Sequence, residues 1–144
     1  MVPKRDLIVI IEGPNLNKIE NRSSIYKSNH KLSVILNLIK ETFDIEYFQS
    51  NIEGEIINKI QSLIDSDAIG LIINPAAYTH YSVAISDALE LLNIKKVEVH
   101  LTNLYKREDF RHISVTAKNC DIVISGAKNY GYFLASEYIK NSIK

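Results

Sequence analysis

Amide, hydroxyl and imidazole side chains follow four short apolar runs of this sequence, at the point where each run ends. Such groups can bind a small polar molecule through hydrogen bonds and can transfer protons. They lie in Glu12-Gly13-Pro14-Asn15-Leu16-Asn17, Gln49-Ser50-Asn51, Asn74 and His100-Leu101-Thr102-Asn103. Each position taken alone is explained better by a turn or a helix cap. The four segments together favour a binding site for a small molecule.

The motifs of several other ligand sites are missing from the sequence. There is no G-x-G-x-x-G after the first run and no G-x-x-x-x-G-K-[ST], so the usual cradles for dinucleotides and nucleoside triphosphates are absent. The four histidines, at positions 30, 80, 100 and 112, form neither an H-E-x-x-H motif nor a close pair of metal ligands. We therefore expect neither a metal nor another cofactor.

The composition is that of an ordinary soluble enzyme. The 144 residues include 17 basic and 17 acidic side chains, so no strong field favours nucleic acid or a membrane surface as a partner. The one cysteine, Cys120, excludes an internal disulfide and is expected to be a buried, inert thiol. The apolar run at Leu7–Ile11 is too short for a signal peptide or a membrane span, and we expect a cytoplasmic protein.

The elements that would position these side chains are predicted by five runs rich in β-branched residues. Continuous apolar runs of this length are typical of parallel strands that are buried on both faces. The runs are Leu7–Ile11, Ile45–Phe48, Ile69–Ile73, Lys96–Val99 and Asp121–Ile124. Because the carboxyl ends of parallel strands lie at one edge of a sheet, the polar segments should meet there.

Helices are predicted between the strands. Apolar residues recur at helical spacing in two sets: Ile56, Ile57, Ile60, Leu63 and Ile64, then Ile85, Ala88, Leu89 and Leu92. Leu32–Phe43 and Lys128–Ile143 are predicted as the first and last helices, and residues 101–119 as largely irregular. The alternation predicts a single domain, 1–144, with a flavodoxin-like, doubly wound sheet of five parallel strands in three α/β/α layers.

Together with their neighbours, the strand ends resemble the type II 3-dehydroquinate dehydratases, or type II dehydroquinases. The similar segments, in order, are Gly13–Asn17, Gln49–Asn51, Glu53–Glu55, Asn74-Pro75, Tyr78–His80, Ser82–Ala84, Asp87–Leu89, Glu98–Leu101, Arg107-Glu108, Phe110-Arg111 and Gly131-Tyr132. The resemblance implies a flavodoxin-like fold and a cofactor-free lyase. Its reaction would remove water reversibly from 3-dehydroquinate to give 3-dehydroshikimate, through an enolate, in the shikimate pathway.

The departures from the family pattern concentrate in residues 18–30, which match the mobile lid of the family. This segment lacks the usual glycines, and Arg22–Tyr26 is one residue shorter than usual. Five other positions carry residues that are unusual for the family: Glu12, Ile52, Ala76, Ser86 and Lys128. None of them matches a position of proton transfer.

The resemblance implies roles for eleven residues. The catalytic set is Tyr26, His100, Arg22, Asn15 and Glu98, and the substrate-binding set is Asn74, His80, Asp87, Leu101, Thr102 and Arg111. Tyr26 would be the base, and His100 the acid that protonates the departing hydroxyl. Asn15 would help to orient His100. Glu98 would support His100 from the same strand, because residues 98 and 100 of a strand face the same side. Since a phenol with an ordinary pKa near 10 is only about 0.1% ionised at pH 7, a cation such as Arg22 is needed nearby.

The substrate-binding set would hold a hydroxylated carboxylate. The resemblance implies that the backbone N–H groups of Leu101 and Thr102 bind the carboxylate. Asn74, His80 and Arg111 would bind hydroxyls, and Asn74 would also position a water molecule on the enolate.

The resemblance also implies a homo-oligomer, a dodecamer built from trimers. In such a trimer, Asp87 would reach the pocket of a neighbouring subunit. It lies about 200° around the helix from Ile85 and so should point away from the core of its own chain.

Two other functions remain open: a flavodoxin-like module that binds a planar ligand, and a family member impaired by its altered lid. Aromatic (chorismate) biosynthesis and quinate breakdown would both need the same reaction.

Overall fold

The structure, a computed structural model, describes residues 3–143, so Met1, Val2 and Lys144 of the predicted domain lie outside the described residues. Its sheet contains β1 (Leu7–Glu12), β2 (Asp44–Gln49), β3 (Ala68–Asn74), β4 (Lys95–His100) and β5 (Ile122–Ser125). All neighbouring strands are parallel, and their order is β2-β1-β3-β4-β5. The five predicted strands and the flavodoxin-like order are confirmed.

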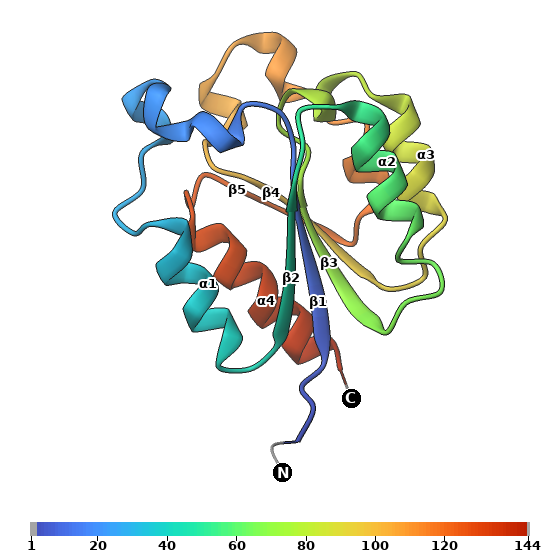
Figure 1. The fold of residues 1–144 in the computed structure, drawn as a ribbon. Helices are drawn as coiled ribbons and strands as arrows, with labels where there is room; N and C mark the ends of the chain where they lie inside the picture. The colour runs from blue at the N-terminus through green and yellow to red at the C-terminus, as the bar shows by residue number, and fades with distance from the viewer. Residues whose placement is uncertain (1–2, 144) are drawn as a thin grey trace.

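Two helices cover each face of the sheet (Figure 1). On one face lie α1 (Leu32–Lys40) and α4 (Tyr130–Ser142), and on the other α2 (Glu53–Gln61) and α3 (Val83–Glu90). The predicted α/β/α layers are therefore confirmed. Two helix ends were predicted wrongly: α1 ends at Lys40 rather than Phe43, and α4 begins after Lys128, whose φ of 56° is incompatible with a helix.

Strand β1 shows why the central strands have continuous apolar sequences. Ile8 and Ile10 face the core under α1 and α4, whereas Val9 and Ile11 face the core under α2 and α3. Burial of each such side chain contributes roughly 1.5–3 kcal/mol. The expectation of burial on both faces is wrong for the two edge strands, because Tyr47 of β2 is 42% exposed and Val123 of β5 is 45% exposed.

Short 3₁₀ helices line the carboxyl edge of the sheet, at the top of Figure 1. They are η1 (Leu16–Asn21), η2 (Ser24–Tyr26), η3 (Ala76–His80), η4 (Leu104–Lys106) and η5 (Asp109–His112). A further 3₁₀ helix, η6 (Ala117–Asn119), packs beside α3 and leads into β5. Together, η4, η5 and η6 confirm that residues 101–119 form an irregular crossover. Within residues 3–143, no helix combines the length and apolar character needed to cross a membrane.

Candidate active site

A pocket of about 140 Å³ lies at the carboxyl edge of the sheet, where the sequence predicts a site. Nine of the eleven predicted site residues line it: Asn15, Arg22, Tyr26, Asn74, His80, His100, Leu101, Thr102 and Arg111. Pro14, Leu16, Ala76, Ala77, Leu104 and Arg107 complete the lining. The structure thus brings together groups that lie up to 96 positions apart, from Asn15 to Arg111.

A tight turn after β1 forms one wall of the pocket. The Gly13 N–H donates to the Asn74 carbonyl at 2.8 Å, and a Cβ on Gly13 would lie only 2.5 Å from the Pro75 carbonyl oxygen. Only glycine fits there. Asn15 follows with a left-handed φ of 70°, which asparagine tolerates better than most residues. Among residues 3–143 no hydrogen bond joins the Asn15 side chain to His100, so its help in orienting His100 stays a prediction.

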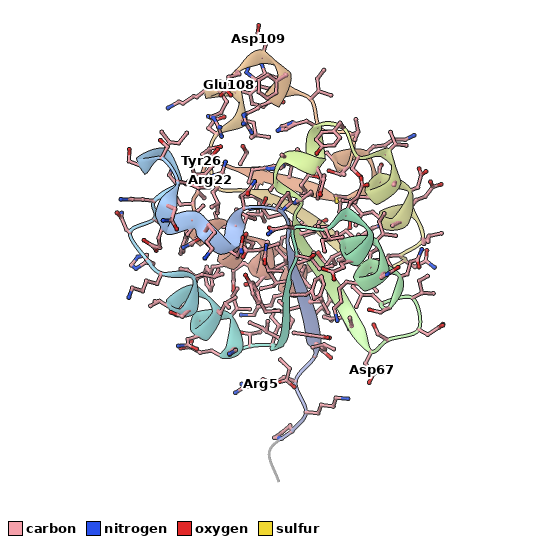
Figure 2. The ribbon with its side chains drawn as sticks, turned by 45° about the horizontal axis from the view of Figure 1, so that its top comes forward. Arg5, Arg22, Tyr26, Asp67, Glu108 and Asp109 are labelled. Carbon is pink, nitrogen blue, oxygen red and sulfur yellow. The ribbon has the colours of Figure 1, made fainter. Side chains whose placement is uncertain are left out.

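The Tyr26 hydroxyl lies between two guanidinium groups. Arg22 donates to it at 2.8 Å, as the sequence predicts, and Arg107 donates at 2.7 Å. The Arg22 guanidinium also lies 3.8 Å from the centre of the Tyr26 ring. Figure 2 shows Arg22 and Tyr26 at the end of the molecule that carries Glu108 and Asp109. Two cationic donors thus meet at one phenol oxygen, where they can stabilise negative charge that develops during a reaction.

Arg107 was not among the predicted site residues. Besides Tyr26, it contacts the Thr102 hydroxyl at 2.9 Å and so joins the lid to the end of β4. It lies 81 positions from Tyr26, and no local pattern predicts such a contact. The one available signal was the segment Arg107-Glu108, which matches the family pattern.

His100 and Glu98 form a hydrogen-bonded pair at the end of β4, as the strand alternation predicts. The His100 Nε2 lies 2.8 Å from a Glu98 carboxylate oxygen, and both side chains are buried. This contact leaves the His100 Nδ1 available to the pocket that the ring lines. A carboxylate beside an imidazole fixes the orientation of the ring.

Glu98 is kept charged by its surroundings. It also accepts hydrogen bonds from Ser114, at 2.8 Å, and from Thr116. Burial alone would raise the pKa of the Glu98 carboxyl, but the hydrogen bond and charge of His100, with these two hydroxyls, hold that pKa below its ordinary value. Glu98 therefore remains a carboxylate near neutral pH.

Other residues that line the pocket are suited to binding hydroxyls and a carboxylate. His80 Nδ1 lies 2.8 Å from the Ile113 carbonyl, and burial lowers the pKa of the ring, so its Nε2 is an acceptor. Within the described chain, the backbone N–H groups of Leu101 and Thr102 have no protein acceptor. Arg111 adds a cationic side chain, and Asn74 a buried amide.

Asp87 stands apart from this pocket, as its helical position predicts. It is exposed on α3 and does not line the pocket of its own chain. The buried face of α3 is formed by Ile85, Ala88 and Leu89. A role for Asp87 in substrate binding would therefore have to be played in another subunit.

Residues 18–30, the segment predicted to be the lid, help to line a second cavity of about 670 Å³ and are hydrogen-bonded to the loop before α4. The Asn129 side chain donates to the His30 carbonyl at 2.8 Å, and Lys128 donates to the Ile25 carbonyl. Tyr26 lines this cavity as well as the smaller pocket. The position of its hydroxyl thus depends on how the lid is held.

Two further groups bear on the chemistry of the chain. Cys120 is half-buried rather than buried, and burial raises the pKa of its thiol to about 12, so the thiol stays neutral. Among residues 3–143, no cluster of three or more His, Cys, Asp or Glu side chains could hold a metal ion.

Comparisons with known proteins agree with this geometry. The family model described as dehydroquinase class II matches residues 6–140. A 3-dehydroquinate dehydratase of Clostridium perfringens is 48% identical over 95% of this chain and 99% of its own, and one of Thermotoga petrophila is 45% identical over 95% and 96%. The crystal structure of a type II dehydroquinase from Butyrivibrio crossotus superposes with a TM-score of 0.87 at 42% identity, over 94% of this chain and 98% of its own. The chain therefore belongs to the type II dehydroquinase family.

Proposed function

We propose that this protein is a hydro-lyase of the shikimate pathway that removes water reversibly from 3-dehydroquinate to give 3-dehydroshikimate. The observation that carries the proposal is the Tyr26 hydroxyl, which two guanidinium groups hold in the same pocket as the His100–Glu98 pair. This pocket contains a base and an acid, which are the two groups that such an elimination needs. The names of the relatives point to the same reaction.

The reaction proceeds in two proton transfers. The Tyr26 phenolate takes a proton from the carbon beside the ketone, and the electron pair moves onto the ketone oxygen to form an enolate. The enolate then re-forms the ketone and expels the β-hydroxyl, which leaves as water with a proton from His100. Tyr26 returns its proton to solvent, and His100 takes one up. The product is a conjugated enone plus one water molecule, so atoms and charge balance.

The remaining groups orient the substrate. The backbone N–H groups of Leu101 and Thr102 bind its carboxylate, since donors of this kind suit an anion without a strong positive field. Asn74, His80 and Arg111 bind its hydroxyls, and Asn74 also positions a water molecule on the enolate oxygen. Asn15 and Glu98 orient His100. Each of these groups belongs to the chain itself, and the proposed reaction uses no metal or other cofactor.

The assay for this function follows the ultraviolet absorbance of the enone after pure protein is mixed with 3-dehydroquinate, with and without a chelator. Equal rates in both samples are expected. A flavin spectrum in the purified protein and no turnover would instead favour a ligand-binding module. No turnover from a folded, flavin-free protein would identify an impaired family member.

The two arginines should assist the Tyr26 base. Arg22→Ala or Arg107→Ala removes one cationic donor from the Tyr26 oxygen. A hydrogen bond from a charged group contributes about 1.5–3 kcal/mol, so we expect each variant to lower kcat on the order of tenfold or more. Steady-state kinetics with 3-dehydroquinate measures the loss.

A matched control is available at the other end of the molecule. Arg5 lies far from Arg22 and Tyr26 in Figure 2 and donates to the carbonyl of Lys40 in α1. Arg5→Ala should keep the parent kcat. If Arg22→Ala and Arg107→Ala also keep it, the arginines do not assist the base.

The enzyme works as a dodecamer built from trimers, in the cytoplasm, with each active site completed by a neighbour. Two observations support sharing of the site. Asp87 is exposed and lies outside its own pocket. Two large apolar side chains, Tyr81 before α3 and Val83 at its first position, are 63% and 61% exposed. Apolar side chains grouped on a surface are typical of an interface.

Complementation between two weak variants tests this arrangement. Asp87→Asn should weaken substrate binding in the neighbouring pocket, whereas Tyr26→Phe disables the base of its own subunit. In mixed trimers, some sites combine an intact Tyr26 with an intact Asp87 from the next subunit. Co-refolded protein should therefore be more active than either variant refolded alone. No gain, with mixed trimers verified by mass spectrometry, would place Asp87 outside the site.

A further inference from the structure

A buried acidic residue, Glu12, lines the larger cavity of about 670 Å³ next to the active-site pocket and plays no part in the proposed reaction. It is only 3% exposed at the end of β1. Two phenol hydroxyls donate to its two oxygens, Tyr47 from β2 and Tyr132 from α4. Burial raises the pKa of the Glu12 carboxyl, and the hydrogen bonds from the two phenols oppose this shift. Because burying such a group costs free energy that hydrogen bonds only partly offset, this residue needs a reason to be there.

Tyr132 connects Glu12 to the pocket. Its hydroxyl lies 3.1 Å from the Asn74 Nδ2, which donates to it. The Asn74 Oδ1 accepts from the Ala76 backbone N–H at 3.0 Å, and a backbone N–H can only donate. This contact fixes which end of the amide is oxygen and which is nitrogen. The Tyr132 oxygen must therefore act as an acceptor toward Asn74.

The direction of the remaining hydrogen bond follows. Burial raises the pKa of the Tyr132 hydroxyl well above its ordinary value, so this group keeps its hydrogen. That hydrogen goes to Glu12, since the other neighbour, the Asn74 Nδ2, is itself a donor. The Glu12 carboxylate thus sets the direction of the whole chain, from Asn74 through Tyr132. Of the two Asn74 Nδ2 hydrogens, one is used in this chain, and the other is left for the pocket that Asn74 lines.

We propose that Glu12 and Tyr132 are positioning residues, which hold the Asn74 amide with one N–H directed into the active site. The inference rests on the proposed function, in which Asn74 holds the water on the enolate. A donor aimed in advance at the oxygen where charge develops accelerates a reaction, and a small misplacement of such a group costs much of that effect. Neither Glu12 nor Tyr132 touches the substrate in this account.

Tyr47 provides a matched control for Tyr132. Both phenols donate to Glu12, but only Tyr132 contacts Asn74. Tyr132→Phe and Tyr47→Phe each remove one hydroxyl from the same carboxylate and keep the ring that fills the space. We expect Tyr132→Phe to lower kcat on the order of ten- to a hundredfold, with KM changed less than threefold. Tyr47→Phe should stay within threefold of the parent in both constants.

Variants of Glu12 test whether the three residues act as one chain. Glu12→Leu removes the acceptor and should lower kcat as Tyr132→Phe does, and the double variant should be no slower than either single variant. Glu12→Gln should retain most of the activity. Its carbonyl oxygen can still accept from the buried Tyr132, while its NH₂ faces Tyr47, which is exposed enough to turn toward water.

A spectroscopic measurement separates positioning from a loss of stability. The side-chain amide of Asn74 gives a pair of signals in a ¹⁵N-labelled sample, assigned by their absence from Asn74→Asp. Tyr132→Phe should shift this pair, and Tyr47→Phe should leave it unchanged. Equal kcat values for the two Phe variants, or an unshifted pair in Tyr132→Phe, would overturn the inference. Turnover by the parent enzyme decides the proposed function separately, before any variant is made.

Discussion

Tyr26→Phe is expected to lower kcat by about 10²–10⁴ while KM stays near the parent value, because general-base catalysis contributes about that much to a rate. The variant removes only the phenol oxygen that Arg22 and Arg107 hold. The ring, which packs beside the apolar core under α1 and α4, remains. The fold and the binding of the substrate should therefore survive. Steady-state kinetics with 3-dehydroquinate measures both constants.

Tyr138→Phe serves as the control for this experiment. Tyr138 lies on α4 and does not line either cavity at the carboxyl edge of the sheet. Its variant should have parent kinetics. Turnover by Tyr26→Phe at close to the parent rate would show that another group is the base.

His100→Gln is the second large effect that we expect. Glutamine can keep the hydrogen bond to the Glu98 carboxylate, but it cannot give up a proton to the departing hydroxyl. Loss of general-acid catalysis should lower kcat by about 10²–10⁴. Thermal unfolding should change little, because the buried carboxylate keeps its partners Ser114 and Thr116.

His112→Gln is the matched control, since His112 lies outside the pocket and its Nε2 contacts only the Arg107 carbonyl, at 3.0 Å. It should keep most of the activity. If His100→Gln were as active as His112→Gln, the proton for the leaving hydroxyl would have to come from another donor.

The sheet could be predicted from the sequence because its central strands are buried on both faces. Strands β1 and β3 have continuous apolar sequences, and the polar residues that follow them mark the carboxyl edge of the sheet. Helix ends were harder to predict. Phe43 is buried and fits the helical pattern of α1, yet it lies in the turn that leads into β2. An apolar pattern reports which residues are buried, and it continues wherever the chain still faces the core.

The residues of the site were predicted mainly from segments that match the family, but the hydrogen bonds between distant parts of the chain were not predicted. Arg107 contacts Tyr26 across 81 positions, and Glu12 accepts from Tyr132 across 120. Such contacts depend on how the lid and α4 pack against the sheet, which no local spacing encodes. Glu12 was visible in the sequence only as a residue unusual for the family, with no sign that two tyrosines would surround it.

In the proposed mechanism Tyr26 removes the proton first, and His100 acts only afterwards, on the leaving hydroxyl. Proton NMR of 3-dehydroquinate in D₂O tests this order, because reversible proton removal exchanges the hydrogen beside the ketone even when no water is lost. We predict that His100→Gln exchanges this hydrogen faster than an enzyme-free sample while forming almost no enone. Tyr26→Phe should show almost no enzyme-catalysed exchange and should also form almost no enone. Parent-like exchange by Tyr26→Phe, or exchange lost only in His100→Gln, would contradict the account.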